Sequence, residues 1–237
     1  MSAWTATDLP SFAGRTVVVT GANSGLGEVT ARELARVGAK VIVAVRNLDK
    51  GNAAAAGMSG DVEVRKLDLQ DLSSVREFAN TVDGLDVLIN NAGIMAVPYA
   101  QTRDGFESQI GTNHLGHFAL TNLLMPKVTD RVVTVSSMMH LIGKISLKDL
   151  DWKSRPYSAW LAYGQSKLAN LLFTKELQRR LDTAGSTVTS LDAFIGPKFT
   201  MGGPTGLTAR SPLASNAKTA SALWELSEQL TDTKFPL

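Results

Sequence analysis

The sequence predicts an α/β fold built on one doubly wound parallel sheet. Short runs rich in β-branched residues alternate with longer stretches of helical periodicity along most of the chain. Such alternation sets parallel strands side by side and joins them by right-handed helical crossovers on both faces. The length of 237 residues suits one large domain, and 44% hydrophobic against 19% charged residues is enough to bury its core. We therefore expect residues 1–237 to form a single domain.

Strands are expected where apolar and β-branched residues run together, and helices where apolar residues recur every three or four positions. In chain order, the expected strands are Thr16–Thr20, Lys40–Val45, Val62–Leu67, Val87–Ile89, Val132–Val135 and Thr187–Leu191. The expected helices are Ser24–Val37, Asp49–Ala56, Ser73–Asn80, Asp104–Leu124 and Tyr157–Leu181. Each of these helices lies between two strands, as a crossover helix must.

One position breaks this alternation. The segment that contains the sixth strand ends at Ala193, and Phe194-Ile-Gly-Pro197 then begins another apolar run. A parallel crossover needs a dozen or more residues and usually a helix, and none are available here. Two alternatives follow: either the second run is a loop, or a segment is absent between Ala193 and Phe194.

The composition argues against several classes of function. A net charge of +2, without a clustered basic stretch, does not favour a nucleic-acid partner. The chain has no cysteine, which excludes disulfides, thiolate zinc sites and cysteine nucleophiles. His114 and His117 lie three positions apart without an obvious carboxylate partner, so we expect them to be structural and expect no metal site.

The sequence shows no signal for a membrane segment. Residues 1–14 are polar and contain Pro10, so they lack the apolar stretch of a signal peptide. No run approaches 18 consecutive apolar residues, the length that a spanning helix needs. We therefore expect a soluble, cytoplasmic protein without a membrane partner.

A glycine-rich turn joins the first strand to the first helix, in the segment Thr20-Gly-Ala-Asn-Ser-Gly-Leu-Gly27. Glycine permits tight turning and close approach to a pyrophosphate, and the start of a helix supplies free N–H groups. A purely structural turn is the alternative, but strand, turn and helix are the context that a dinucleotide-binding Rossmann-type site requires. The residues expected to contact a cofactor here are Gly21, Asn23, Ser24, Gly25, Leu26 and Gly27.

The end of the second strand indicates which dinucleotide is used. An NAD site usually has Asp or Glu there to hold the ribose 2′-hydroxyl. This chain has no acid at that point but carries Arg46, whose guanidinium suits a 2′-phosphate. A solvated surface arginine is the alternative. We expect NADP(H) as the cofactor.

Polar and small residues follow the third and fourth strands. Asp68-Leu69 and Asn91-Ala92-Gly93 stand at strand carboxyl ends, where ligands of open α/β sheets bind. Each segment alone could be a simple turn. Together with the glycine turn, they predict further contacts to the cofactor.

Tyr163 and Lys167 form the clearest catalytic pair. Four positions apart on a helix, both side chains lie on one face. A phenol has a pKa of about 10 and is a poor base at neutral pH, whereas a nearby ammonium stabilises the phenolate and lowers that pKa. Such a tyrosine can give or take the proton of a hydroxyl group while a hydride is transferred.

These motifs together resemble the short-chain dehydrogenase/reductase family, from about Thr16 to Ala193. The resemblance implies that Thr20–Gly27 is the cofactor loop and that Asp68 lies on the adenine side. It also implies that Asn91-Ala92-Gly93 supports the fourth strand beside the nucleotide.

The same resemblance implies a catalytic tetrad, all of whose positions carry the expected residue type. Asn113 would hold a proton-relay water, and Ser137 would hydrogen-bond the substrate oxygen. Tyr163 would be the general acid or base, and Lys167 would also bind the nicotinamide ribose. The family interconverts carbonyls and alcohols of small molecules, so that activity is expected here.

Details of the motifs narrow the resemblance to the retinol dehydrogenase and protochlorophyllide reductase-like branch. These are Asn113-His-Leu-Gly-His-Phe118, Tyr163-Gly-Gln-Ser-Lys-Leu-Ala-Asn170 and the 26 positions that separate Ser137 from Tyr163. The long separation predicts an added loop over Ile145–Trp152 near the site. The absence of cysteine counts against light-driven protochlorophyllide reduction.

The chain departs from the family after the sixth strand. Members continue with a Pro-Gly motif, a cofactor-contacting threonine and a substrate lid, whereas Phe194-Ile-Gly-Pro197 follows directly here. This run resembles the family's final strand, and Ser215–Leu230 its last helix, so we expect a lid segment to be missing between Ala193 and Phe194.

The sequence is consistent with two functions from different classes. An active NADP(H)-dependent oxidoreductase is favoured by the complete tetrad. A non-catalytic NADP-binding sensor or scaffold of the same fold would be favoured by a truly absent lid. Relatives often pair through the helices near residues 104–124 and 157–181, so a homodimer or homotetramer is expected.

Overall fold

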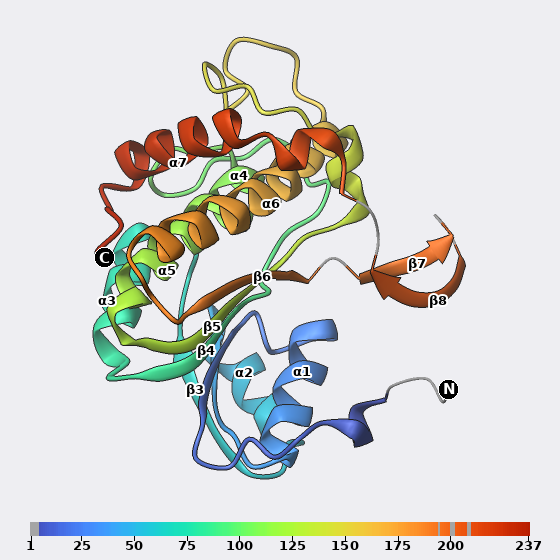
Figure 1. The fold of residues 1–237 in the computed structure, drawn as a ribbon, viewed down its shortest axis with the longest axis vertical. Helices are drawn as coiled ribbons and strands as arrows, with labels where there is room; N and C mark the ends of the chain where they lie inside the picture. Colours follow the sequence, from blue (N-terminus) through green and yellow to red (C-terminus); the bar gives the residue numbers. More distant parts are fainter. Residues whose placement is uncertain (1–4, 194, 200–201, 208–209) are drawn as a thin grey trace.

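A six-stranded sheet, all of whose strands are parallel, forms the centre of the protein (Figure 1). The computed structural model describes residues 5–193, 195–199, 202–207 and 210–237. The strand order is β3-β2-β1-β4-β5-β6, so the chain runs outward in one direction from β1 and then returns to extend the sheet on the other side. The predicted doubly wound α/β fold is therefore confirmed.

The elements of the sheet alternate with helices as expected. The strands are β1 (Thr16–Thr20), β2 (Lys40–Val45), β3 (Asp61–Lys66), β4 (Leu85–Asn90), β5 (Val128–Val135) and β6 (Thr189–Ala193). The α-helices are α1 (Gly25–Arg36), α2 (Leu48–Ala55), α3 (Leu72–Thr81), α4 (Ser108–Ile110), α5 (Gly116–Leu124), α6 (Ala159–Thr183) and α7 (Ala217–Thr231). A π-helix, η2 (Gly111–Leu115), joins α4 to α5, and the short 3-10 helices are η1 (Ala6–Asp8), η3 (Met125–Lys127), η4 (Met138–Ile142) and η5 (Pro212–Ser215).

The two faces of the sheet are buried under different helices (Figure 1). Successive side chains of a strand point to opposite faces, so Val17 and Val19 of β1 pack on the side of α1, while Val18 packs with Phe118 of α5. Both faces of β1 and β2 are apolar because both are covered, as is usual for parallel sheets.

The expected helix over Asp104–Leu124 begins later than predicted. Gly105 has a φ of +85° and lies in a turn, and the helix starts at Ser108. The carboxylate of Glu107 accepts the N–H groups of Gln109 and Ile110 and so caps this start. A capped start at Glu107 excludes the preceding residues from the helix.

The chain after β6 differs from the expected final parallel strand. β7 (Ile195–Phe199) pairs antiparallel with β8 (Gly202–Leu207) in a separate two-stranded sheet. The expectation that the run at 194–197 would be the family's last sheet strand is wrong, because a hairpin needs only a short turn whereas a parallel strand needs a crossover. The junction of Ala193 with Phe194 itself lies outside the described residues, since Phe194 is not described. The predicted last helix is present as α7.

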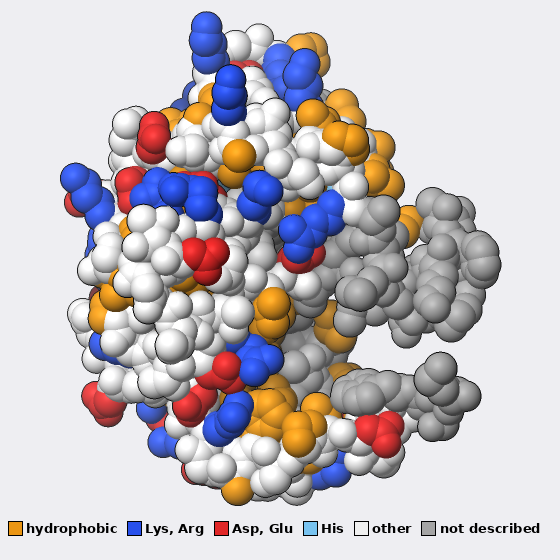
Figure 2. Space-filling view, in the orientation of Figure 1, with side chains coloured by type: hydrophobic (Ala, Val, Ile, Leu, Met, Phe, Trp, Pro, Cys, Tyr) orange, Lys and Arg blue, Asp and Glu red, His pale blue; other side chains and the backbone are white. Residues whose placement is uncertain are grey.

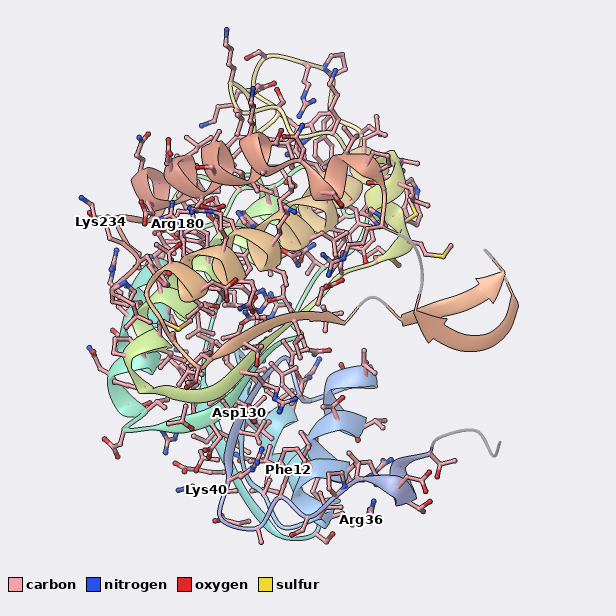
Figure 3. The ribbon with its side chains drawn as sticks, viewed as in Figure 1. Phe12, Arg36, Lys40, Asp130, Arg180 and Lys234 are labelled. Atoms are coloured by element: carbon pink, nitrogen blue, oxygen red, sulfur yellow. The ribbon has the colours of Figure 1, made fainter. Side chains whose placement is uncertain are left out.

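An aromatic cluster fastens α7 to the outer side of α5 and α6. The Trp224 ring stacks on Phe173, with ring centroids 5.6 Å apart and an interplanar angle of 5°, and meets Phe118 edge-on at 4.8 Å. Arg180 of α6, labelled in Figure 3, has its guanidinium carbon 4.7 Å from the centroid of the Trp224 ring. Trp224 also donates a hydrogen bond from Nε1 to Glu228. The helix is therefore part of the core rather than an appendage.

Coverage by α7 bears on the expected oligomer. Nearly all of α5 and the stretch of α6 from Ala162 to Thr174 are buried within the chain itself. Two chains cannot pair through the outer face of these helices while α7 covers it. A homodimer or homotetramer stays a prediction and would have to use other surfaces.

The surface carries charges of both signs. On the face drawn in Figure 2, Lys and Arg side chains lie among Asp and Glu side chains rather than in one separate patch. Across the part of the chain that the structure describes, no helix is long and apolar enough to cross a membrane.

We expect Trp224→Ala to lower the free energy of unfolding by about 3–5 kcal/mol, because it empties a fully packed aromatic site between two helices. Urea denaturation measures this value. Trp160, which is 51% exposed on α6, is the matched control; Trp160→Ala should change the stability by no more than about 0.5 kcal/mol. Equal effects of the two substitutions would contradict the assigned role of α7.

Candidate active site

The candidate site is a cavity of about 440 Å³ at the carboxyl ends of β1, β2, β3 and β4. The order of the strands reverses between β1 and β4, and open α/β sheets bind ligands at such a switch point. The lining residues are Thr20, Gly21, Asn23, Ser24, Leu26, Gly27, Ala44, Val45, Arg46, Asn47, Lys50, Leu67, Asp68, Leu69, Gln70, Asn91, Ala92, Gly93, Ile94 and Thr112. Of the residues predicted to bind the cofactor, Gly25, Tyr163 and Lys167 are not among them.

The glycine turn has the geometry that the sequence predicted for it. Gly21 has a φ of +67°, and a Cβ there would lie 2.9 Å from the Cα of Ala92. Gly25 has a φ of +57°. A Cβ on Gly27 would lie 2.8 Å from the carbonyl oxygen of Gly21 and still closer to the side chain of Asn91. Gly21 and Gly27 therefore let the ends of β1 and β4 come together under the cavity, while Gly25 is required by its positive φ.

The start of α1 faces this turn with its N–H groups available. Ser24 is the N-cap residue, but its side chain makes no capping hydrogen bond. The first turn of a helix has N–H groups without intrahelical partners and carries a partial positive charge. The backbone cradle and this helix start together fit the pyrophosphate of a dinucleotide.

A pair of cations lies on the β2 side of the cavity. Arg46 and Lys50 both line it and both are exposed. Between them, Asn47 caps α2 by accepting the N–H of Lys50 at 2.9 Å. Arg46 was among the predicted residues and Lys50 was not, although a second cation one helical turn after Arg46 is visible in the sequence.

The segment after β3 closes the cavity on another side. The carboxylate of Asp68 accepts the N–H of Gln70 at 3.0 Å, and the Gln70 side chain donates to Thr112 at 2.9 Å. Asp68 and Leu69 are thus held at the edge of the cavity, as predicted. Gln70 and Thr112 were not predicted, because their place depends on how η2 packs against this turn.

The predicted catalytic side chains converge where β5 and α6 meet. The side chain of Ser137 lies near enough to the Tyr163 phenol to favour its ionised form. Lys167 donates to the carbonyl oxygen of Val135 at 3.2 Å, and its nitrogen lies 5.6 Å from the centroid of the Tyr163 ring. A Cβ on Gly93 would lie 3.6 Å from Lys167 Nζ, so this group reaches the loop that borders the cavity.

Burial controls the ionisation of this pair. It lowers the pKa of Lys167 to about 8, because the buried ammonium loses its hydration. The pKa of Tyr163 is raised by burial, which outweighs the opposing effect of the Ser137 side chain. The expected lowering of the phenol pKa by Lys167 is not found: the pKa of Tyr163 is raised, and the ammonium lies 5.6 Å from the ring centroid and is bonded to Val135.

Asn113 lies in the π-helix η2 and is fully buried. Its side chain accepts the N–H of Ile94 and donates to the Ile94 carbonyl, both at 2.9 Å, and donates to Ser166 at 2.9 Å. Asn113 thereby ties the loop after β4 to α6, the helix that carries Tyr163 and Lys167. π-helical turns are frequent at functional sites.

A profile of the short chain dehydrogenase family matches residues 15–193, which include every predicted site residue. The chain belongs to the short chain dehydrogenase family. Human retinol dehydrogenase 13 is 50% identical over 191 residues, covering 75% of this chain and 58% of that protein. Several retinol dehydrogenases match at similar identity, which confirms the retinol dehydrogenase branch of the resemblance. This family member spans less than two thirds of the length of these first relatives.

Two solved structures extend the comparison. An uncharacterized protein from Mycobacterium paratuberculosis is 63% identical, with a TM-score of 0.97 over 100% of both chains. A structure from Beutenbergia cavernae, described as an NAD(P) dependent gluconate 5-dehydrogenase with bound NADP at low occupancy, is 29% identical. Its TM-score is 0.58, over 77% of this chain and 72% of that one. Short chain dehydrogenases bind a nicotinamide dinucleotide, and the cavity of this member has the cradle for one.

We expect Gly21→Ala to weaken the binding of a nicotinamide dinucleotide by about tenfold or more, because the added methyl group collides with Ala92 and displaces the cradle. Gly14→Ala is the matched control. Gly14 also has a positive φ, of +78°, but a Cβ there meets nothing within 4 Å. Isothermal titration with NADPH compares the two variants, and equal affinities would contradict the role assigned to the close approach.

Proposed function

We propose that this protein is an NADP(H)-dependent oxidoreductase that interconverts a carbonyl and an alcohol. The observation that carries the proposal is the convergence of Ser137, Tyr163 and Lys167 where β5 and α6 meet, beside a cavity shaped for a dinucleotide. The names of the relatives support the reaction class, and the proposed substrate is a small-molecule carbonyl or alcohol.

The proposed mechanism follows from what each side chain can donate. A bound nicotinamide dinucleotide supplies or takes up the hydride. The Ser137 hydroxyl hydrogen-bonds the substrate oxygen, and the phenol of Tyr163 gives that oxygen its proton during reduction. Because the pKa of Tyr163 is raised, the phenol is protonated at neutral pH, which is the form that reduction needs.

Lys167 has two proposed roles in this mechanism. With its pKa lowered to about 8, it remains mainly an ammonium at pH 7 and loses its proton as the pH rises through about 8. In the charged form it binds the ribose on the nicotinamide side and favours the phenolate that is left on Tyr163 after proton transfer. Asn113 holds a water for proton relay beside them.

The preference for NADP(H) is supported by the charge at the end of β2. Arg46 and Lys50 both line the cavity there, and the strand end offers no carboxylate to a ribose 2′-hydroxyl. Two cations suit a 2′-phosphate, the guanidinium through paired hydrogen bonds and the ammonium as a point charge. The other proposed cofactor contacts are Gly21, Asn23, Ser24, Gly25, Leu26, Gly27, Asp68, Leu69, Asn91, Ala92 and Gly93.

We also propose that the family's substrate lid is missing between Ala193 and Phe194. The family match ends at residue 193, the position where the predicted Pro-Gly motif would begin, and this supports the proposal.

We expect Arg46→Ala to raise the dissociation constant of NADPH by tenfold or more and to leave that of NADH nearly unchanged. A lost charge-assisted hydrogen bond costs about 1.5–3 kcal/mol, and only NADPH carries the phosphate. Lys50→Ala should act in the same direction but less strongly, because an ammonium makes no bidentate contact. An unchanged NADPH affinity in the Arg46 variant would refute the assignment.

We expect the protein to oxidise NADPH in the presence of a panel of aldehydes and ketones, and Tyr163→Phe to abolish this turnover while NADPH still binds. The substitution removes only the hydroxyl that transfers the proton. Lys167→Ala should impair both turnover and binding. Binding of NADPH by the wild-type protein without turnover of any carbonyl would favour the non-catalytic sensor or scaffold, and a normal rate in Tyr163→Phe would exclude the mechanism.

A further inference from the structure

The hydroxyl of Thr20, at the end of β1, is the centre of a buried hydrogen-bond network. Its oxygen lies 2.9 Å from the backbone nitrogens of Asn91 and Ala92, both of which donate to it. It also lies 2.9 Å from Nε2 of His117 and 3.4 Å from the carbonyl oxygen of Ile89. Thr20 and His117 are both buried.

Counting donors and acceptors assigns every proton of this network. The N–H groups of Asn91 and Ala92 donate to the Thr20 hydroxyl, the first of them shared with the Ile89 carbonyl oxygen at 3.0 Å, so the hydroxyl is left to donate its own proton. The other ring nitrogen of His117, Nδ1, lies 3.1 Å from the carbonyl oxygen of Asn113, which can only accept. Nδ1 therefore carries the hydrogen of the neutral ring. The bare Nε2 accepts the Thr20 proton at 2.9 Å, a shorter contact than that of the same hydroxyl with the Ile89 carbonyl oxygen at 3.4 Å.

The surroundings of His117 favour this neutral form. Burial is the largest effect and lowers the pKa of the imidazole to about 4; the hydrogen bond to the Asn113 carbonyl opposes it, and the positive charge of Lys167 adds a smaller lowering. The other titratable neighbour, His114, has a pKa lowered to about 3 by burial and by His117. At neutral pH the imidazole is a fixed connector with one donor and one acceptor.

We propose that His117 is a positioning residue that sets the spacing between the cofactor cradle and the catalytic tetrad. Thr20 holds the loop after β4 at Asn91 and Ala92, and the Asn113 side chain holds the same loop at Ile94. His117 hydrogen-bonds to both Thr20 and Asn113. The inference rests on the proposed function for its kinetic consequence, but not for its geometry.

The loop after β4, which Thr20 and Asn113 hold in place, borders both the cofactor cradle and the catalytic tetrad. It contains Gly93, where a Cβ would lie 3.1 Å from Asn113 Oδ1 and 3.6 Å from Lys167 Nζ. Asn91 and Ala92 line the dinucleotide cavity. A small change in the distance between Thr20 and Asn113 therefore moves the loop relative to the ammonium that acts in catalysis.

His114 is a matched control for burial alone. It lies three residues before His117, in η2, and is equally buried. Its Nε2 lies 3.0 Å from the hydroxyl of Ser227 on α7, and its ring packs against Phe118 and Phe173. Its contacts therefore point to the helical core and not to the loop after β4.

The network is tested first without a bound cofactor, by ¹H–¹⁵N NMR of the histidine rings. We expect His117 to show a protonated Nδ1 and an unprotonated Nε2, unchanged between pH 8 and pH 5. An Nε2–H tautomer, or protonation of the ring within this range, would overturn the proposal. This measurement does not depend on finding a substrate.

The kinetic test compares three substitutions at His117 with His114→Leu. His117→Leu removes both hydrogen bonds, His117→Asn keeps an amide near the Nδ1 position, and His117→Gln keeps one near the Nε2 position. We expect His117→Leu to lower kcat by about tenfold to a hundredfold, because small misplacements of reacting groups cost about this much. The Asn and Gln variants should each recover part of it, with KM for the carbonyl nearly constant throughout.

His114→Leu should lower the melting temperature by an amount similar to His117→Leu and leave kcat within about threefold of wild type, since it disturbs only packing. Equal losses of kcat in the two leucine variants, or no recovery in the Asn and Gln variants, would mean that His117 only packs in the core and would overturn the inference. If the wild-type protein turns over no carbonyl, the proposed function fails, while the NMR result still decides whether the connector exists.

Discussion

The carboxyl ends of β1 and β4 approach so closely that Gly21 has no room for a side chain. A Cβ at Gly21 would lie 2.9 Å from the Cα of Ala92, and the hydroxyl of Thr20 accepts two backbone N–H groups from the opposite loop. This contact fixes where the cradle opens and directs the uncapped start of α1 toward it. The cavity, the pair of cations beyond β2 and the loop that reaches Lys167 all take their positions from this contact.

A second constraint is the burial of α6 on almost every side. The 3-10 helix η4 and α7 pack against α6, and its stretch from Ala162 to Thr174 is buried throughout, so Tyr163 and Lys167 project from a helix that has little freedom to shift. Gly143 lies so close to Gly164 of α6 that a Cβ on it would come within 2.2 Å of the Gly164 carbonyl oxygen. The same burial removes water from the ammonium and the phenol, so packing and the shifts in their pKa values have one cause.

Sequence reasoning predicted those parts of the protein that depend on local patterns. The bounds of β1 and β2 agree with prediction because continuous apolar runs covered on both faces are easy to recognise. The glycine turn, Arg46 and the Tyr163–Lys167 pair could be predicted for the same reason, since each depends on residues within one turn or one strand end. The start of α4 was misplaced because Glu107 caps it through its side chain, and β7 was misassigned because a strand's partner cannot be read from its own composition.

The parts of the site that were missed depend on contacts between distant segments. Thr20 and His117 are 97 positions apart, and each belongs to a motif that was read separately, one as a cofactor loop and the other as a structural histidine pair. Neither motif contains the information that they touch. The donor and acceptor count becomes informative only once the fold brings a hydroxyl, two amides, an imidazole and a carbonyl into one buried place, because a buried group must then find its partner within that set. His117 was expected to be structural, and it is buried as that expectation requires. Its burial is also what makes it a connector between the cofactor cradle and the catalytic tetrad in our proposal.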